Sequence, residues 1–168
     1  MTKTSKVIAL TALITALLLM SVTQAWAATM KFRLVVFTTN VESTEVGDVA
    51  DHNLYLGEST GLASFETGEV AVATLKWTCD YTKGTGSCNG YFLLTFEDGS
   101  TIGYTVDQTT RPDPKGKGSL FEATLVISEG SGRYAGIQGK GTYTGRRPVV
   151  FGAAAVNYFD HIITYTLP

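Results

Sequence analysis

The chain has 168 residues and an almost balanced charge, with 13 basic and 15 acidic residues and a net charge of −2. A mildly acidic chain has no electrostatic hold on a phosphate backbone, which argues against nucleic acid as a partner. Two histidines, two cysteines and no clustered carboxylates offer too few ligands for a zinc or calcium site, so we expect no metal and no cofactor.

Residues 1–27 are typical of a secretory signal peptide. A basic head with Lys3 and Lys6 precedes an apolar run over 7–22 and small residues at Ala25 and Ala27. The run is shorter than the roughly 20 residues of a membrane-spanning helix, and an uncleaved anchor is the alternative. We therefore expect one secreted or periplasmic domain over 28–168, with a net charge of −4 and no membrane contact after cleavage.

Eight segments after residue 28 alternate apolar and polar residues with the period of a strand, and none shows a helical period of useful length. The predicted strands cover 30–39, 51–58, 68–79, 88–97, 100–109, 119–128, 137–147 and 157–167. Short connections, such as the Asp98-Gly99 turn, join antiparallel neighbours, because parallel pairing would need a crossover helix in each gap.

This succession favours an all-β fold, a single closed antiparallel eight-stranded up-and-down barrel, because closure removes the exposed edges of a sheet. A two-sheet sandwich is the alternative. The run 91–94 (YFLL) is apolar on both faces. It predicts that another element or a second copy of the chain covers the outer face, which makes a homo-oligomer a candidate assembly.

The longer connections have distinct compositions. Residues 40–50 (NVESTEVGDVA) form the most polar one, and 111–118 (RPDPKGKG) are predicted to be an exposed loop. Pro148 ends the seventh strand because proline cannot donate to a ladder. Residues 149–156 (VVFGAAAV) are predicted to form either a short helix or a coil that plugs one end of the barrel.

The two cysteines, Cys79 and Cys88, flank a turn in WTCDYTKGTGSCNG. An even count outside the cytoplasm favours a disulfide, and an antiparallel hairpin would place the two residues opposite each other within bridging range. A metal or redox pair is disfavoured by the absence of a C-x-x-C motif and of a histidine nearby in sequence.

The segment 128–147 (SEGSGRYAGIQGKGTYTGRR) contains GSGRYA, which fits a dinucleotide-binding pattern. That motif requires a helix after the glycine turn, and each of the four further glycines would weaken a helix by about 1 kcal/mol. We therefore expect a turn anchored by Tyr134 and then a strand. One face of that strand would carry Gly139, Gly141, Tyr143 and Gly145, so that bulky neighbours can lie against its backbone.

The stretch LVISEGSGRYAGIQGKGTYTG resembles the late hairpin of the allene oxide cyclase and dirigent-like barrel superfamily. An apolar strand, a glycine-rich turn around an aromatic residue and a G-x-G on the next strand carry the resemblance, which covers residues 119–147. It implies an eight-stranded barrel whose interior binds an apolar small molecule and steers its cyclisation or coupling by shape, without a cofactor. It carries no catalytic residue over to this chain.

Glu122 and His161 are the candidate catalytic residues, because each is a polar residue within an apolar row of a predicted strand. If both faced the lumen, burial would favour their neutral forms and poise them for proton transfer. The alternative is a buried, hydrogen-bonded histidine and a glutamate on the outer face.

Four aromatic residues are candidates for ligand binding or, alternatively, for the core: Trp77, Tyr104, Phe159 and Tyr165. The expected function is an exported barrel that binds an apolar small molecule in its lumen and, if it is an enzyme, acts as a cofactor-independent isomerase or cyclase. The alternative is a non-catalytic exported interaction or structural protein with a filled barrel.

Overall fold

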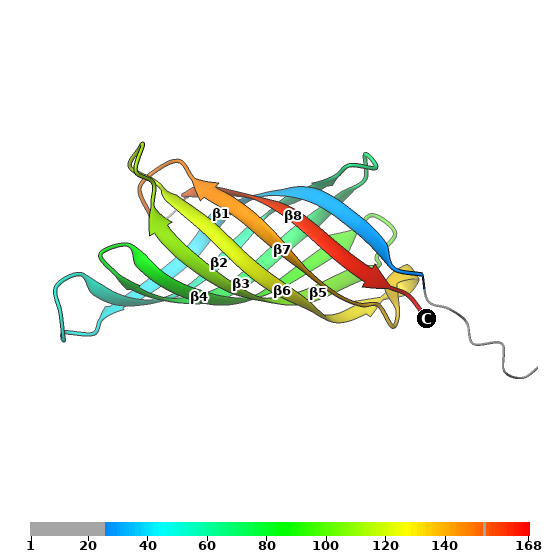
Figure 1. Cartoon of the computed structure of the whole chain (residues 1–168), viewed down its shortest axis with the longest axis horizontal. Coiled ribbons are helices and arrows are strands. Elements are labelled where there is room, and N and C mark those ends of the chain that lie inside the picture. Colours follow the sequence, from blue (N-terminus) through cyan, green and yellow to red (C-terminus); the bar gives the residue numbers. More distant parts are fainter. Residues whose placement is uncertain (1–25, 153) are drawn as a thin grey trace, which may run out of the picture.

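A computed structural model describes residues 26–152 and 154–168 as one closed barrel of eight antiparallel strands. Each strand pairs with its neighbours in sequence, and β8 closes the barrel on β1 (Figure 1). The strands are β1 (Ala28–Glu45), β2 (His52–Phe65), β3 (Val70–Thr82), β4 (Thr85–Phe96), β5 (Thr101–Pro112), β6 (Ser119–Ser131), β7 (Gln138–Arg147) and β8 (Val156–Thr166). Residues 1–25, which make up most of the predicted signal peptide, lie outside the described residues. Within the described part, no helix is long and apolar enough to cross a membrane.

The barrel confirms the predicted fold class and all eight strands, and it rules out the alternative of a two-sheet sandwich. Several strands extend a few residues beyond the predicted ranges, and two extend much further: β1 continues through the largely polar residues 40–45, and β2 continues through 59–65. Beyond the pair Phe37 and Val156, β1 no longer contacts β8 and is paired with β2 alone. This projecting part lies in solvent and needs no apolar face. Its sequence therefore lacks the apolar–polar alternation by which the other strands were predicted.

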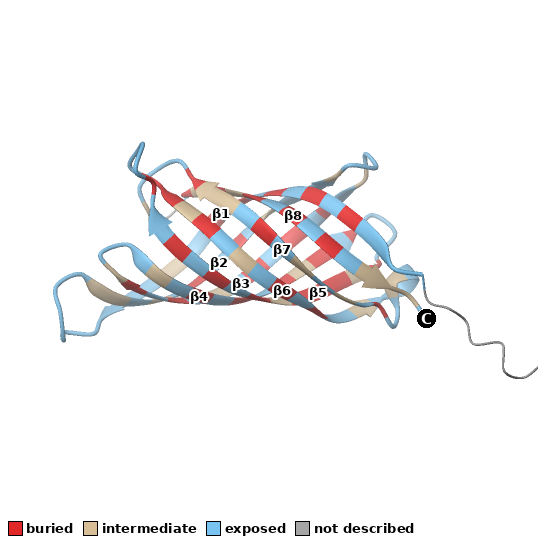
Figure 2. Cartoon of the chain, viewed as in Figure 1, coloured by how far each residue is buried: buried red, intermediate tan, exposed pale blue. Residues whose placement is uncertain are grey.

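Buried and exposed residues alternate along the strands (Figure 2). The half of the barrel nearer the start of β1 and the end of β8 is filled by large apolar side chains. Its most deeply buried members include Leu34, Leu94, Ile102, Tyr104 and Ile163. An interior packed in this way leaves no space for a ligand. A ligand cavity inside the barrel must therefore lie in the other half.

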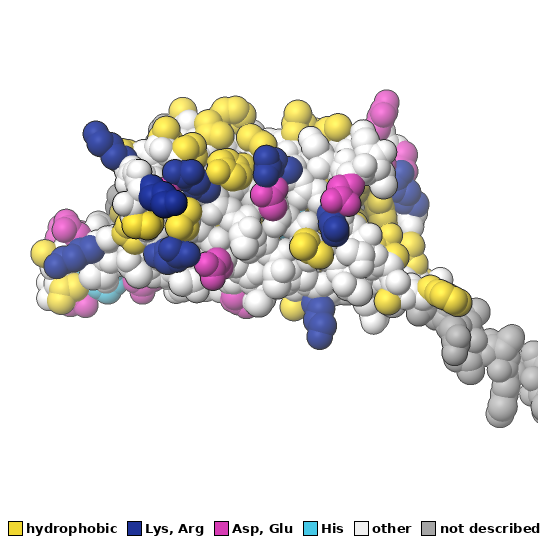
Figure 3. Space-filling view, turned by 45° about the horizontal axis from the view of Figure 1, so that its top comes forward, with side chains coloured by type: hydrophobic (Ala, Val, Ile, Leu, Met, Phe, Trp, Pro, Cys, Tyr) yellow, Lys and Arg dark blue, Asp and Glu magenta, His cyan; other side chains and the backbone are white. Residues whose placement is uncertain are grey.

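The outer wall carries scattered charged and apolar side chains (Figure 3). Tyr91, whose outward position suggested a covering element, remains 73% exposed in this chain. On β1, β2 and β3, the exposed residues Val35, Leu62 and Val72 are neighbours in the strand register. They form a short apolar stripe across three strands, which we call the β1–β3 stripe.

The glycine-rich segment forms a turn and a strand, as predicted. A 3-10 turn at Gly132–Tyr134 is followed by β7, and no helix begins at Gly136. Gly132 and Gly136 have φ values of 59° and 76°, which side-chain-bearing residues rarely adopt. Tyr134 anchors the turn by packing on Phe96, with ring centroids 4.9 Å apart. The dinucleotide pattern is therefore accidental.

The bare inner face of β7 allows side chains of β8 to lie against its backbone. A Cβ atom on Gly141 would come within 2.8 Å of Ile163 Cα, and one on Gly145 within 2.5 Å of Phe159 Cδ1. Tyr143 is the inward side chain between these two glycines. Glycine in β7 thus makes room for the bulky residues of β8 inside a narrow barrel.

Two connections shape the barrel end opposite the filled half. Residues 148–152, 154 and 155, the described part of this connection, form no helix and run as a coil beside β1, where Thr38 N–H donates to Ala155 O at 3.1 Å and Ala154 N–H donates to Thr38 O at 3.0 Å. This supports the coil rather than the helix expectation. The loop 111–118 is largely exposed, as predicted, but Asp113 is buried and forms an ion pair with Arg146.

Candidate functional site

A partly open cavity occupies the barrel end that carries the β1–β2, β3–β4, β5–β6 and β7–β8 connections. The cavity has a volume of about 50 Å³. A single buried water needs roughly 10–15 Å³ on the same scale, so the cavity has room for a compact organic group. The aromatic part of its lining consists of Trp77, Tyr81, Phe92, Phe121, Tyr143, Phe151 and Phe159.

A chain of hydrogen bonds runs along one side of the cavity. The Tyr143 hydroxyl donates to Gln108 Oε1 at 2.7 Å, and Gln108 Nε2 donates to Thr110 Oγ1 at 2.9 Å. Tyr81 Oη lies 2.9 Å from Thr110 Oγ1 and 2.7 Å from Cys88 Sγ. Burial raises the pKa of both tyrosines, so their hydroxyls stay protonated at neutral pH. This row of hydrogen-bonded side chains forms a polar wall that can orient a ligand by hydrogen bonding.

Arg147, the last residue of β7, also lines the cavity and is only 7% exposed. Its guanidinium lies over the rings of Phe151 and Phe121, with Cζ 4.7 Å and 5.6 Å from the ring centroids, and Nη2 donates to Ser119 Oγ at 2.7 Å. Burial lowers the pKa of this guanidinium from its usual value, but an arginine remains charged. The cavity therefore contains a buried positive charge.

The predicted disulfide joins Cys79 and Cys88, whose Cα atoms are 4.1 Å apart on β3 and β4. The two-residue turn that connects these strands has positive φ angles at Lys83 (53°) and Gly84 (77°), as tight hairpins require. Both cysteines line the cavity beside Trp77. The disulfide thus holds one part of the cavity wall.

Two of the four aromatic residues predicted to bind a ligand line the cavity, namely Trp77 and Phe159. The Trp77 indole N–H donates to Ser59 Oγ at 3.0 Å. Tyr104 instead belongs to the filled half of the interior, and Tyr165 is half-buried near the end of β8 at the opposite end of the barrel. For these last two residues, packing in the core is the role that the structure supports.

The predicted pair of Glu122 and His161 does not form. Glu122 faces solvent, with a side chain 65% exposed, and forms an ion pair with Arg111 at 3.1 Å. On β6, Phe121 and Leu125 face inward, so Glu122, with the opposite parity, faces outward. Here the alternative of an outer-face glutamate is correct.

His161 faces inward but lies in the filled half, 2% exposed, and is absent from the cavity lining. Its ring stacks on Phe32 at 4.4 Å between centroids, and its Nε2 lies 3.3 Å from Tyr104 Oη. Burial lowers its pKa to about 3, outweighing the opposing effects of the Phe159 carbonyl and of Asp160. It is thus the buried, hydrogen-bonded histidine of the alternative interpretation.

Two cavity residues, Gln108 and Arg147, were not predicted, and neither was Thr110, which is buried and accepts a hydrogen bond from Gln108 without lining the cavity. Gln108 and Thr110 continue the inward row of Tyr104 and Val106 along β5. Arg147 continues the row of Tyr143 and Gly145 on β7. Extending each alternating row to the end of its strand would have found these residues.

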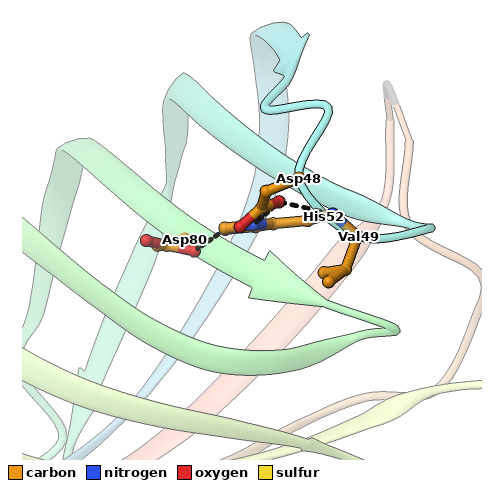
Figure 4. Close-up of polar contacts among 4 residues, drawn as sticks. All are labelled: Asp48, Val49, His52 and Asp80. Carbon is orange, nitrogen blue, oxygen red and sulfur yellow. Dashed lines mark hydrogen bonds and ion pairs between the residues drawn. The ribbon is translucent and has the colours of Figure 1, made fainter.

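The other histidine lies outside the barrel, between two carboxylates (Figure 4). His52 Nδ1 is 2.6 Å from Asp48 Oδ1, and its Nε2 is 2.8 Å from Asp80 Oδ1. The β1–β2 connection is thereby fastened to β3. Hydrogen bonds to Asp48 and then to Asp80 raise the pKa of His52, and the bond to His52 lowers the pKa of Asp48. The pattern fits a structural clasp.

We expect this clasp to act mainly in its protonated form. Because the pKa of His52 is higher in the folded chain than in the unfolded chain, its contribution is full below about pH 6.5 and is lost as the pH rises through the raised pKa. The melting temperatures of the wild type and of His52→Gln, measured from pH 6 to pH 9, should therefore converge with rising pH. A constant difference across that range would contradict this role.

Fold and site together define the class: an eight-stranded antiparallel β-barrel, filled at one end, with a small aromatic-lined cavity and a disulfide at the other. Comparison of the chain with protein-family models and with curated proteins finds no match. The cavity's own geometry therefore provides the argument for function.

Proposed function

We propose that this protein is an exported barrel that binds a compact, largely apolar small molecule in the cavity at its open end. The observation that carries the proposal is the aromatic lining of this partly open cavity together with convergent hydroxyl and amide groups. Ligand sites are typically apolar concavities with a few fixed polar groups. Export is supported by the leader-like sequence over 1–27 and by the disulfide, a bond that persists in oxidising compartments.

The similarity to allene oxide cyclase and dirigent-like barrels suggests a reaction steered by shape. The lining supports steering rather than acid–base catalysis, because its described residues include no carboxylate and no histidine. The side chains of Tyr81, Gln108, Tyr143 and Asn157 can orient a ligand by hydrogen bonds. Binding is therefore the central proposal, and a cofactor-independent isomerisation or cyclisation is its extension.

A second candidate is a non-catalytic interaction protein. Two observations favour it: the filled half of the barrel, and the exposed β1–β3 stripe of Val35, Leu62 and Val72. Apolar surface of this kind can pack against another protein or a second copy of the chain.

Ligand binding can be tested with phenylacetamide, a neutral probe of one ring and one amide. We expect saturable changes in the NMR signal of the Trp77 indole N–H, which lies in the cavity wall. Val106→Phe would fill the cavity from an inward position and should abolish these changes. The matched control Val126→Phe makes the same substitution on the outer wall and should leave binding intact.

The absence of any saturable change in the wild type, or equal binding by both variants, would overturn the proposal. The oligomeric state, measured in parallel by sedimentation, would distinguish the non-catalytic interaction protein from the ligand-binding barrel. A self-associating barrel that binds no probe, and that becomes monomeric when Leu62 in the stripe is replaced by Ser, would favour an interaction role.

A further inference from the structure

The only charged side chain that lines the cavity is that of Arg147, among the lining residues that the structure describes. The ion pairs formed by the described residues do not include it, whereas the neighbouring Arg146 is paired with Asp113. Residues 1–25 and 153 contain no acidic residue. Arg147 is therefore a buried cation without an anionic partner within this chain.

The bonding capacity of this guanidinium is only partly used. One donor is satisfied by Ser119, and two aromatic rings lie against its faces, but Nε is buried and has no hydrogen-bond partner among the described residues. A second cavity residue, Thr38, has a buried hydroxyl in the same condition. Buried donors are nearly always paired, and an unpaired buried charge is costly. Because Ser119 satisfies only one of the donors of Arg147, this side chain keeps unused donor capacity at the cavity wall, which a ligand can engage.

We infer that, within the ligand cavity proposed above, Arg147 receives the carboxylate of a compact carboxylic acid with an aromatic or branched apolar body. A guanidinium presents planar, forked donors that match the two oxygens of a carboxylate. Folding has already desolvated the cation, so a bound anion need not do so. The inference rests on the proposed function and specifies the ligand class of the same site.

Three features restrict the ligand. A single positive charge favours a monoanion over a phosphate dianion. The rings of Trp77, Phe121 and Phe151 surround the cavity and favour an apolar body next to the anionic group. The cavity volume of about 50 Å³ favours a ring or a short branched chain over a long acyl chain.

Phenylacetate and phenylacetamide form a matched test pair, because they have nearly the same shape and differ in charge. Titration of the purified protein, followed by the Trp77 indole signal, should show phenylacetate binding at least tenfold more tightly than phenylacetamide at pH 7. Sulfate provides a third arm. Binding of sulfate as tight as that of phenylacetate would indicate a site for any small anion and would overturn the inferred ligand class.

The variant Arg147→Met keeps an unbranched side chain of similar reach and removes the charge. We expect it to reduce the phenylacetate preference from tenfold or more to about one or less, while phenylacetamide still binds. The control Arg111→Met removes an arginine from the outer wall, where it pairs with Glu122, and should leave the preference unchanged. An unchanged preference in Arg147→Met would overturn the inference.

A second measurement uses the wild type alone, in case Arg147→Met fails to fold. The phenylacetate preference should fall as the pH drops through the ligand's own carboxylic acid pKa, roughly 4.3 by analogy with glutamate, whereas phenylacetamide binding follows only the stability of the protein. Equal binding of both probes at pH 7 would overturn the carboxylate assignment and leave the proposed cavity function standing. If neither probe binds, both proposals fail.

Discussion

Lowering the pH from 6.5 to about 4 should destabilise the protein through His161. The unfolded histidine accepts a proton near pH 6.5, whereas in the folded chain burial keeps it neutral down to a pKa of about 3. In that window the unfolded state binds one more proton, so the free energy of unfolding falls by up to about 1.4 kcal/mol per pH unit. Above pH 6.5 this residue imposes no pH dependence.

The variant His161→Phe keeps a ring against Phe32 and removes the titrating group. Denaturant unfolding of the wild type and this variant at pH 4.5, 5.5 and 6.5 should show a steeper pH slope for the wild type. His52 has a raised pKa and is protonated in both folded and unfolded chains over most of this range, so His52→Gln should retain the wild-type slope. Parallel slopes for all three proteins would show that His161 is not buried as described.

NMR titration of the folded wild type checks the same point without a variant. The ring signals of His52 should titrate above pH 6.5, and those of His161 should stay in the neutral form until the protein unfolds. A His161 that titrates reversibly near pH 6.5 would place this residue in contact with water and reopen its candidacy as a catalytic group.

Removing the disulfide should have the second large effect. Cys79 and Cys88 are separated by 9 positions in sequence, and closure of a loop of this length is worth roughly 2–3 kcal/mol on the chain-entropy model. For a domain of this size, that loss corresponds to roughly 10 °C in melting temperature. Because both cysteines line the cavity, we also expect the variant Cys79→Ala/Cys88→Ala to bind phenylacetamide more weakly.

Calorimetry of the wild type, of the reduced wild type and of the double alanine variant measures the effect. A matched control, Thr78→Ala/Asn89→Ala, changes the adjacent outward-facing pair on the same two strands and should lose far less stability. Equal melting temperatures for the oxidised wild type and the double cysteine variant would contradict the prediction.

Much of the fold was predictable because a barrel strand has a strict period of two. Alternation along β8 correctly assigned Phe159, His161 and Ile163 to one inward row. Glycine parity on β7 correctly predicted a bare face against β8, and the cysteine spacing predicted the disulfide. Each of these inferences depends only on neighbours along one strand or across one hairpin.

The candidate site was predictable only in part. Parity shows which residues share a face, but it does not say which face of β6 is inward, and Glu122 was misplaced for that reason. Depth along the barrel is equally hidden, because it depends on the stagger between strands. Tyr104 and His161 point inward, yet they lie in the filled half, whereas Trp77 and Phe159 reach the cavity.

The amino-acid sequence by itself determined the local chemistry of this protein: extended strands, their turns, the disulfide hairpin and the glycine face, all set by steric preferences over a few residues. Only the tertiary structure decided where the barrel is hollow. Closure brings β5, β7 and the coil residues 148–152 together around one end, leaving Arg147 buried without an acidic partner among the described residues and filling the opposite end with side chains. That partition arises from packing among residues far apart in the chain, which no single stretch of sequence encodes.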